Sequence, residues 1–133
     1  MTTLWAVSDL HAAVRVNGDR IEELVPPNPN DWLIVAGDVA ERIDLVINTL
    51  ARLKNRYATV IWVPGNHELF SRGQDAYQGR EKYDRLVEGC REIGVVTPED
   101  PFPVFGGVTV VPLFTLYDYS FRCLLYTSPS PRD

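Results

Sequence analysis

The sequence predicts an α/β fold built on a parallel sheet, because three short apolar runs alternate with a helical pattern. The runs cover residues 4–7, 32–36 and 60–63. Each is rich in β-branched or aromatic residues and ends at polar residues or glycine, as is typical of strands buried on both faces. Within residues 43–53, apolar side chains recur every three or four positions, which indicates an amphipathic helix. A strand, a helix and a strand in this order imply parallel pairing.

Further along the chain, the sequence predicts one more helix and one hairpin. Apolar residues follow helical spacing between positions 83 and 90, and Gly94 is expected to end this helix. Residues 104–111 contain two apolar runs joined by Gly106 and Gly107. Two adjacent glycines suit a tight hairpin turn, because that turn requires positive φ at both central positions.

Composition places the chain among soluble globular proteins and excludes a largely disordered one. Its 133 residues are 45% hydrophobic and 23% charged, enough for one domain with a real core. The net charge of -5 disfavours a nucleic-acid backbone or an anionic membrane as partner, so nucleic acid or a nucleotide remains possible only as a substrate. No apolar run is long enough to span a bilayer, and the first residues do not have the pattern of a signal peptide. Two cysteines are too few for a disulfide scaffold. We therefore expect a cytoplasmic protein.

Residue types that bind metals follow each of the three predicted strands. Asp9 and His11 follow the first. Asp38 follows the second, and Asn66 and His67 follow the third. In open α/β sheets, ligands bind outside the carboxyl ends of the strands. We therefore expect these five side chains to meet at one edge of the sheet.

The spacing of Asp9 and His11 suits a shared ion. Side chains two positions apart on an extended chain point the same way, so a carboxylate and an imidazole could bind one ion while Leu10 turns into the core. The alternative is that Asp9 caps a helix and His11 lies on the surface.

The other two strand ends also allow more than one interpretation. Asp38 follows Gly37, where the backbone can turn sharply, and its two oxygens could bridge two metals or cap the following helix. Asn66 offers a neutral carbonyl oxygen suited to a divalent ion, and the neighbouring His67 is either a ligand or a proton donor. Metal-binding residue types after all three strands, in this order, indicate a metal site more strongly than those after any one strand.

Three segments of the chain resemble the first three motifs of the calcineurin-like metallophosphoesterase family. They are Ser-Asp-Leu-His at 8–11, Gly-Asp-Val-Ala-Glu-Arg at 37–42 and Gly-Asn-His-Glu at 65–68. The resemblance implies a four-layer α/β/β/α sandwich with a two-metal centre at the edge of the sheet. It also implies that residues 1–121 are the N-terminal part of one such domain, whose second sheet is incomplete. The Ser/Pro-rich residues 122–133 are then a non-native or disordered tail.

The resemblance also implies a role for each residue of these motifs. Asp9 and His11 would bind the first metal, Asp38 would bridge both metals, and Asn66 would bind the second. His67 would not bind metal but would protonate the leaving oxygen.

Two residues after the second strand have less certain roles. Glu41 stands where the family often has an aspartate that orients the histidine, and its longer side chain leaves that role open. Arg42 either contacts phosphate or is a solvated helix residue.

The implied reaction is hydrolysis of a small phosphoester substrate. Two divalent ions (Mn, Fe, Zn, Co or Ni) would lower the pKa of a bridging water, and the resulting hydroxide would attack phosphorus while His67 acts as general acid. Monoesters, diesters, nucleotides and phosphoproteins all remain possible substrates, and the oligomeric state is open. The alternative is a non-catalytic scaffold or interaction protein of the same fold.

The family has further motifs, Gly-His and Gly-His-x-His, that supply three more histidine ligands. This chain has only His11 and His67. We therefore expect it to bind at most one divalent ion, weakly, and to hydrolyse little or nothing as it stands. We also expect one face of the first sheet to lack its cover, which would expose Trp62 and Phe114.

Overall fold

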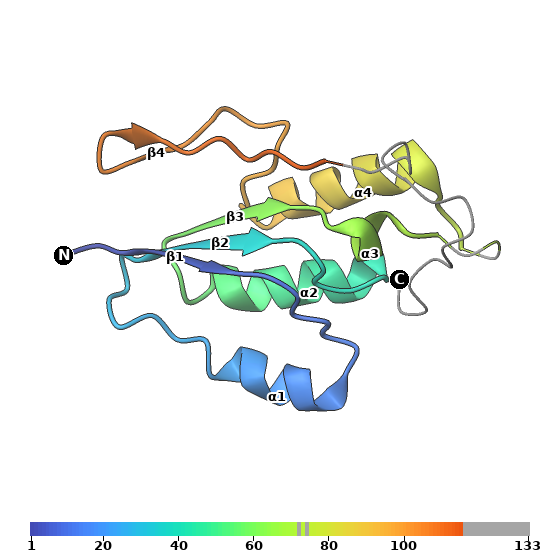
Figure 1. Cartoon of the computed structure of the whole chain (residues 1–133), viewed down its shortest axis with the longest axis horizontal. Coiled ribbons are helices and arrows are strands. Elements are labelled where there is room, and N and C mark those ends of the chain that lie inside the picture. Colours follow the sequence, from blue (N-terminus) through green and yellow to red (C-terminus); the bar gives the residue numbers. More distant parts are fainter. Residues whose placement is uncertain (72, 74, 116–133) are drawn as a thin grey trace, which may run out of the picture.

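The computed structural model describes residues 1–71, 73 and 75–115, and Figure 1 shows its course. The tail predicted at 122–133 lies outside these residues. Among the helices that the structure describes, none has the length and apolar composition needed to cross a membrane.

Three parallel strands form the main sheet, in the order β1-β2-β3. They are β1 (Leu4–Val7), β2 (Trp32–Ala36) and β3 (Thr59–Val63). The first two have the predicted bounds, and the third begins one residue earlier than predicted. On the far side of β3, Val96 adds a single parallel bridge, in which its N–H donates to the carbonyl of Val60 at 2.9 Å.

Four helices and a short hairpin complete the described chain. The predicted helices are α2 (Ile43–Lys54) and α4 (Gly79–Glu92), and Gly94 ends α4 with φ +76° as expected. The hairpin of β4 (Val104–Phe105) and β5 (Val108–Thr109) has positive φ at both glycines of its turn. The sequence did not predict α1 (Arg15–Glu22) or α3 (Asn66–Leu69). The mixed architecture confirms the predicted α/β class.

The core lies on the face of the sheet that α1 and α2 cover (Figure 1). Val7, Val35 and Trp62 are in register, so their side chains share this face. Side chains of α4 belong to the same buried cluster, and α4 packs against α2. The sheet and its helices thereby form one continuous core that fixes the ends of the three strands relative to one another.

The expected exposure of Trp62 is wrong. Trp62 is fully buried, because its place in the register directs it toward the helices. The open face is the opposite one, where Ala6 and Ala36 are exposed. Successive side chains of a strand point to opposite faces of the sheet, so a shift of one residue decides which apolar side chains are left uncovered.

The hairpin and the segment after it cover part of this open face. The rings of Trp32 and Phe105 lie 5.2 Å apart, centroid to centroid, in an edge-to-face arrangement. Phe114 is only half-buried, with its ring 5.4 Å from that of Tyr83. Contacts between aromatic rings thus hold the hairpin near the sheet and Phe114 near α4.

The buried carboxylate of Asp31 anchors the N-terminal strand. It accepts hydrogen bonds from the backbone N–H of Thr3 at 2.7 Å and from the indole N–H of Trp5 at 2.9 Å. These hydrogen bonds, with that of Trp5 the strongest, hold the pKa of Asp31 below its ordinary value. A lowered pKa means that folding favours the ionised form, so this stabilisation is present at neutral pH and is lost as the pH falls.

Asp31→Asn is therefore expected to lower the urea midpoint of unfolding at pH 7, with a difference from wild type that narrows below about pH 4. Asp19→Asn, an exposed position of α1, serves as the control and should leave the midpoint unchanged at pH 7 and at pH 3. Unfolding followed by tryptophan fluorescence measures this. A difference of constant size between pH 7 and pH 3 would contradict the proposed role of the charge.

Candidate metal centre

The loops that follow the three parallel strands meet at the carboxyl end of the sheet. Backbone hydrogen bonds join the first loop to the second, because the N–H groups of Asp9 and His11 donate to the carbonyls of Gly37 and Asp38 at 3.1 and 3.0 Å. The third loop begins α3 directly after β3. The core therefore places all three loops side by side, as the order of motifs predicted.

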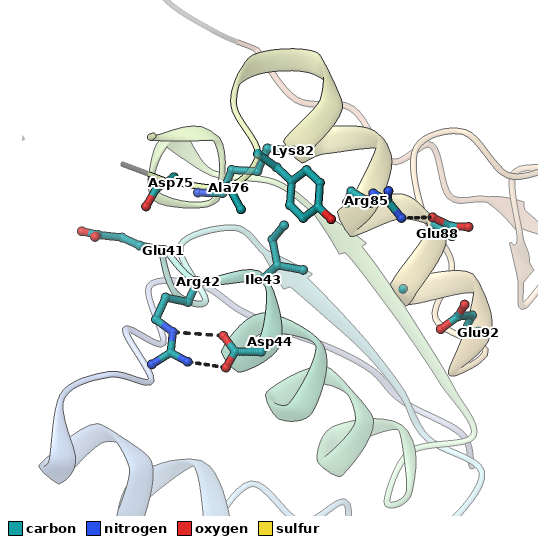
Figure 2. Close-up of a pocket in the computed structure, with 12 residues that line it drawn as sticks. Glu41, Arg42, Ile43, Asp44, Asp75, Ala76, Lys82, Arg85, Glu88 and Glu92 are labelled. Atoms are coloured by element: carbon teal, nitrogen blue, oxygen red, sulfur yellow. Dashed lines mark hydrogen bonds and ion pairs between the residues drawn. The ribbon is translucent and has the colours of Figure 1, made fainter. Parts of the chain in front are cut away.

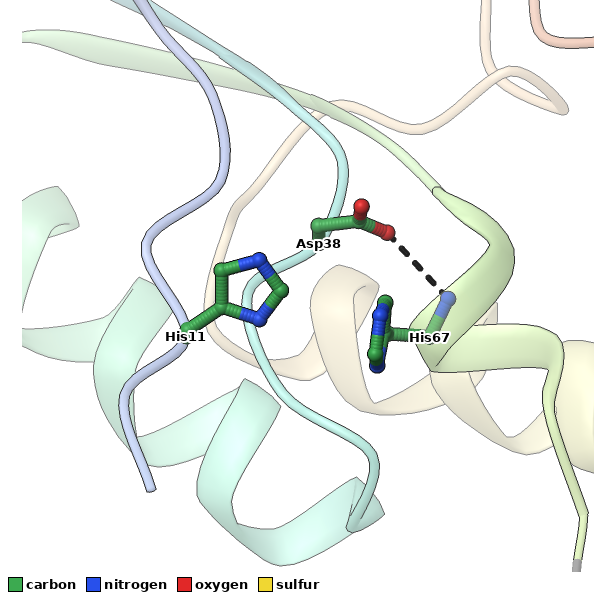
Figure 3. Close-up of side chains that lie close together, drawn as sticks. All are labelled: His11, Asp38 and His67. Atoms are coloured by element: carbon green, nitrogen blue, oxygen red, sulfur yellow. Dashed lines mark hydrogen bonds between the residues drawn. The ribbon is translucent and has the colours of Figure 1, made fainter. Parts of the chain in front are cut away.

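Three side chains from these loops, those of His11, Asp38 and His67, face one another (Figure 3). Each offers one ligand atom, and the three atoms lie within 4.8 Å of one another. The two imidazole rings are 4.9 Å apart and nearly perpendicular. The backbone N–H of His67 donates to a carboxylate oxygen of Asp38 at 3.1 Å, which fixes the start of α3 against the second loop.

The other two predicted ligands lie at the margins of this group. A carboxylate oxygen of Asp9 is 3.9 Å from Nε2 of His11, and its side chain is 65% exposed. The side-chain amide nitrogen of Asn66 can donate to both carboxylate oxygens of Asp38, at 3.3 Å each. The structure thus brings all five strand-end side chains into one cluster.

The conformation expected for the first motif is wrong. Asp9 and His11 have φ of +56° and +42°, so the chain there is left-handed and not extended. The reason is that β1 ends at Val7, after which the chain bonds to the carbonyls of the second loop and no longer to a strand. Leu10 still turns into the core as expected, with 7% exposure.

Asp38 shares this unusual backbone, with φ +56° directly after Gly37 at φ +83°. Left-handed φ at a residue other than glycine costs energy and persists where the surroundings hold it, most often at functional sites. Three of the predicted metal ligands are therefore held in strained positions by the loops around them.

Glu41 and Arg42 follow Asp38 on the way into α2. A carboxylate oxygen of Glu41 is 3.5 Å from Nδ1 of His67, close enough for an ion pair but long for a hydrogen bond. Arg42 is exposed and pairs with Asp44 through two N–H groups, one of them 3.1 Å from its acceptor. Glu41 therefore faces the candidate centre, whereas the guanidinium of Arg42 is engaged outside it.

Sequence reasoning gave no separate role to Glu68, the last residue of the third motif. Its buried carboxylate accepts backbone N–H bonds from Gly65 at 3.0 Å, Asp38 at 2.9 Å and Val39 at 2.8 Å. Burial raises the pKa of Glu68, and these N–H groups oppose that effect. Glu68 therefore joins the second loop to the third through the backbone N–H groups of Asp38 and Val39.

The chemistry of the cluster fits a divalent cation. Carboxylate, imidazole and amide groups are ligands for Mn, Fe, Co, Ni and Zn, and one ion with bonds of about 2.0–2.2 Å could join donor atoms that lie this close after small side-chain rotations. His11, Asp38 and His67 are half-buried, so an ion would reach them from solvent. The cluster also contains both imidazoles of the chain.

Comparisons with known proteins agree with this geometry. The chain matches the model of the calcineurin-like phosphoesterase family over residues 2–127. It is 57% identical over 125 residues to an [acyl-carrier-protein] phosphodiesterase, PptH, of Mycobacterium tuberculosis, a match covering 90% of this chain and 39% of that protein. The crystal structure of a phosphopantetheinyl hydrolase (PptH) from M. tuberculosis superposes with a TM-score of 0.85 at 55% identity, over 90% of this chain and 45% of that one. The chain thus spans less than half the length of the proteins it matches.

Proposed function

The chain belongs to the calcineurin-like phosphoesterase family, and on that premise we propose that it supplies the first half of the active site of a metal-dependent phosphodiester hydrolase. The observation that carries this proposal is the convergence of His11, Asp38 and His67, one from each strand end. A protein that served only as a scaffold would not need to hold ligand groups in strained backbone positions.

We assign Asp9, His11 and Asp38 to one metal ion, and Asp38 with Asn66 to a second. Ions held there would supply Lewis acidity, which would neutralise charge on the phosphoryl oxygens and make a nucleophile available at neutral pH. With the donors of this chain alone, the second ion would have two protein ligands, so we propose that this chain by itself binds one ion better than the other.

We assign His67 the role of donating a proton to the leaving oxygen. The carboxylate of Glu41 near its Nδ1 would orient the ring. The side chain of Glu41 is one carbon longer than that of the aspartate that the family often has there, and its 3.5 Å separation from the ring supports the proposed role.

The similar proteins suggest the class of substrate. One carries the name of a phosphodiesterase acting on acyl carrier protein and the other that of a phosphopantetheinyl hydrolase. We propose the same class here, a phosphodiester that links a phosphopantetheine arm to a carrier protein. We also propose a cytoplasmic location, because the buried free thiol of Cys90 suits a reducing compartment.

Hydrolysis of bis(4-nitrophenyl) phosphate with Mn²⁺ tests this function in the protein expressed from the longest reading frame that contains this sequence. We expect turnover by the wild type, and a kcat lower by about a hundredfold or more for His67→Ala, the range for loss of a general acid. The metal content of the variant should be unchanged, because His67 is not assigned as a ligand.

Asn48→Ala, an exposed position of α2, is the control and should retain wild-type activity. Turnover that is unaffected by Asp38→Asn would refute the assignment of the site. A folded protein that binds Mn²⁺ and shows no turnover would favour the non-catalytic scaffold.

A further inference from the structure

A cavity of about 720 Å³ lies next to the candidate metal centre and shares only Glu41 with the residues assigned a role above. Its walls are the first turn of α2, residues 75–77 and one face of α4 (Figure 2). We call it the α2–α4 cavity. Its volume lies in the range of sites that hold a small molecule, about 300–1,000 Å³.

The α2–α4 cavity borders the metal centre at Glu41. This side chain lines the cavity and also lies 3.5 Å from Nδ1 of His67. In Figure 2, Glu41 and Asp75 are at one end and Glu92 is at the other. A phosphoester bound at His67 would therefore lie beside one end of this cavity.

The cavity is elongated along α4. Its lining includes Lys82, Arg85 and Glu92, which recur at helical spacing and so share one face of the helix. Ten residues of α-helix separate the first from the last, a length of about 15 Å. An extended chain fits this shape better than a compact ring system.

The charges of the lining disfavour an anionic ligand. Among the residues that the structure describes, five acidic and three basic side chains line the cavity. Two of the basic ones already pair with acidic neighbours, Arg42 with Asp44 and Arg85 with Glu88, as the dashed lines in Figure 2 show. The net charge of the lining is therefore negative, and a second phosphate or a carboxylate on the ligand would be repelled.

The third basic side chain, that of Lys82, is engaged in shaping the wall. It is 3% exposed, and its ammonium group donates to the carbonyl of Phe70. This bond ties the first turn of α4 to the segment that follows α3. Lys82 is thereby held to the chain and is not extended toward solvent as an anion-binding group.

The lining also contains apolar surface from Ile43, Ala76 and Tyr77. Carboxylates beside apolar groups accept hydrogen bonds from N–H and O–H donors on a ligand whose carbon chain contacts the apolar part. We propose that the α2–α4 cavity is a subsite for an uncharged, extended arm of the phosphoester that carries amide and hydroxyl groups. The proposal rests on the proposed function, because it assigns a binding subsite to the arm of that same substrate.

Pantetheine is the probe, because it is an uncharged chain with two amides and two hydroxyl groups. Pantothenate is its anionic counterpart. We expect pantetheine to compete with bis(4-nitrophenyl) phosphate and pantothenate to compete at least about tenfold more weakly, a difference of about 1.4 kcal/mol. In the 133-residue chain, pantetheine should shift the amide resonances of Ala76, Tyr77 and Gly89, which line the cavity.

Ala76→Trp fills the cavity and is expected to raise the Ki for pantetheine at least about tenfold in a variant that still hydrolyses the small diester. Ala58→Trp is the matched control, an exposed position before β3 at the opposite end of the sheet, and should leave the Ki for pantetheine unchanged. Equal inhibition of wild type and Ala76→Trp, or stronger inhibition by pantothenate, would overturn the proposal. If the small diester is not hydrolysed, the proposed function fails, and the resonance shifts still decide whether the cavity binds the arm.

Discussion

Glu68→Gln is expected to lower the free energy of unfolding by about 2–4 kcal/mol and to weaken Mn²⁺ binding by about 10- to 100-fold. The amide has nearly the shape of the carboxylate, so the change removes charge and one acceptor without leaving a cavity. Few single substitutions of similar size should cost this much.

The geometry around Glu68 explains why neither orientation of the amide is tolerated. One carboxylate oxygen accepts the N–H of Val39, and the other accepts those of Asp38 and Gly65. Whichever oxygen the NH₂ group replaces, at least one buried N–H then faces a donor and loses its bond. The backbone that positions Asp38 is part of that loss, so metal affinity should fall together with stability.

Urea unfolding at pH 7 and calorimetric titration with Mn²⁺ measure the two effects. Glu81→Gln, an exposed position in the first turn of α4, makes the same chemical change and should leave both quantities near wild type. A Glu68→Gln protein that keeps wild-type stability would show that the hydrogen bonds of this carboxylate add nothing net to the fold.

The sequence predicted some elements of this fold and missed others, for physical reasons. The strands and α2 were predictable because buried strands are continuous apolar runs and a half-buried helix repeats its apolar residues every three or four positions. The helix α1 was not, because only Ile21 of its eight residues is buried and Gly18 interrupts it. A helix held by so few core contacts leaves no periodic signal.

The candidate site was predictable to a similar degree. The convergence of Asp9, Asp38 and His67 follows from parallel strands whose carboxyl ends share one edge. The buried role of Glu68 does not follow, because a carboxylate in a polar motif gives no sign that three backbone N–H groups from two loops will surround it. The left-handed backbone of Asp9 and His11 escaped prediction for the same reason, since contacts between loops impose it.

Gly65→Ala is expected to disrupt the candidate metal centre more selectively. A Cβ at this position would lie 2.6 Å from the backbone nitrogen of Asp38 and closer still to one of its carboxylate oxygens. The φ of Gly65 is -95°, which alanine adopts freely, so the effect is purely steric. The clash can be relieved only if the loop carrying Asp38 and the start of α3 move apart.

A displacement of about 1 Å at a metal ligand is expected to lower kcat/KM by at least about a hundredfold. We therefore expect Gly65→Ala to hydrolyse bis(4-nitrophenyl) phosphate at the low level of Asp38→Asn, with weakened Mn²⁺ binding. Overpacking of this kind should also cost about 1–3 kcal/mol of stability.

Gly18→Ala is the matched control, because a Cβ there meets nothing within 4 Å and the residue lies inside α1. Alanine is the better helix former, so this variant should gain about 0.5–1 kcal/mol of stability and keep full activity. The same added methyl group thus has opposite expected effects at the two glycines. Wild-type turnover by Gly65→Ala would mean that Asp38 tolerates displacement, and the assignment of this carboxylate as the bridge between two ions would then fail.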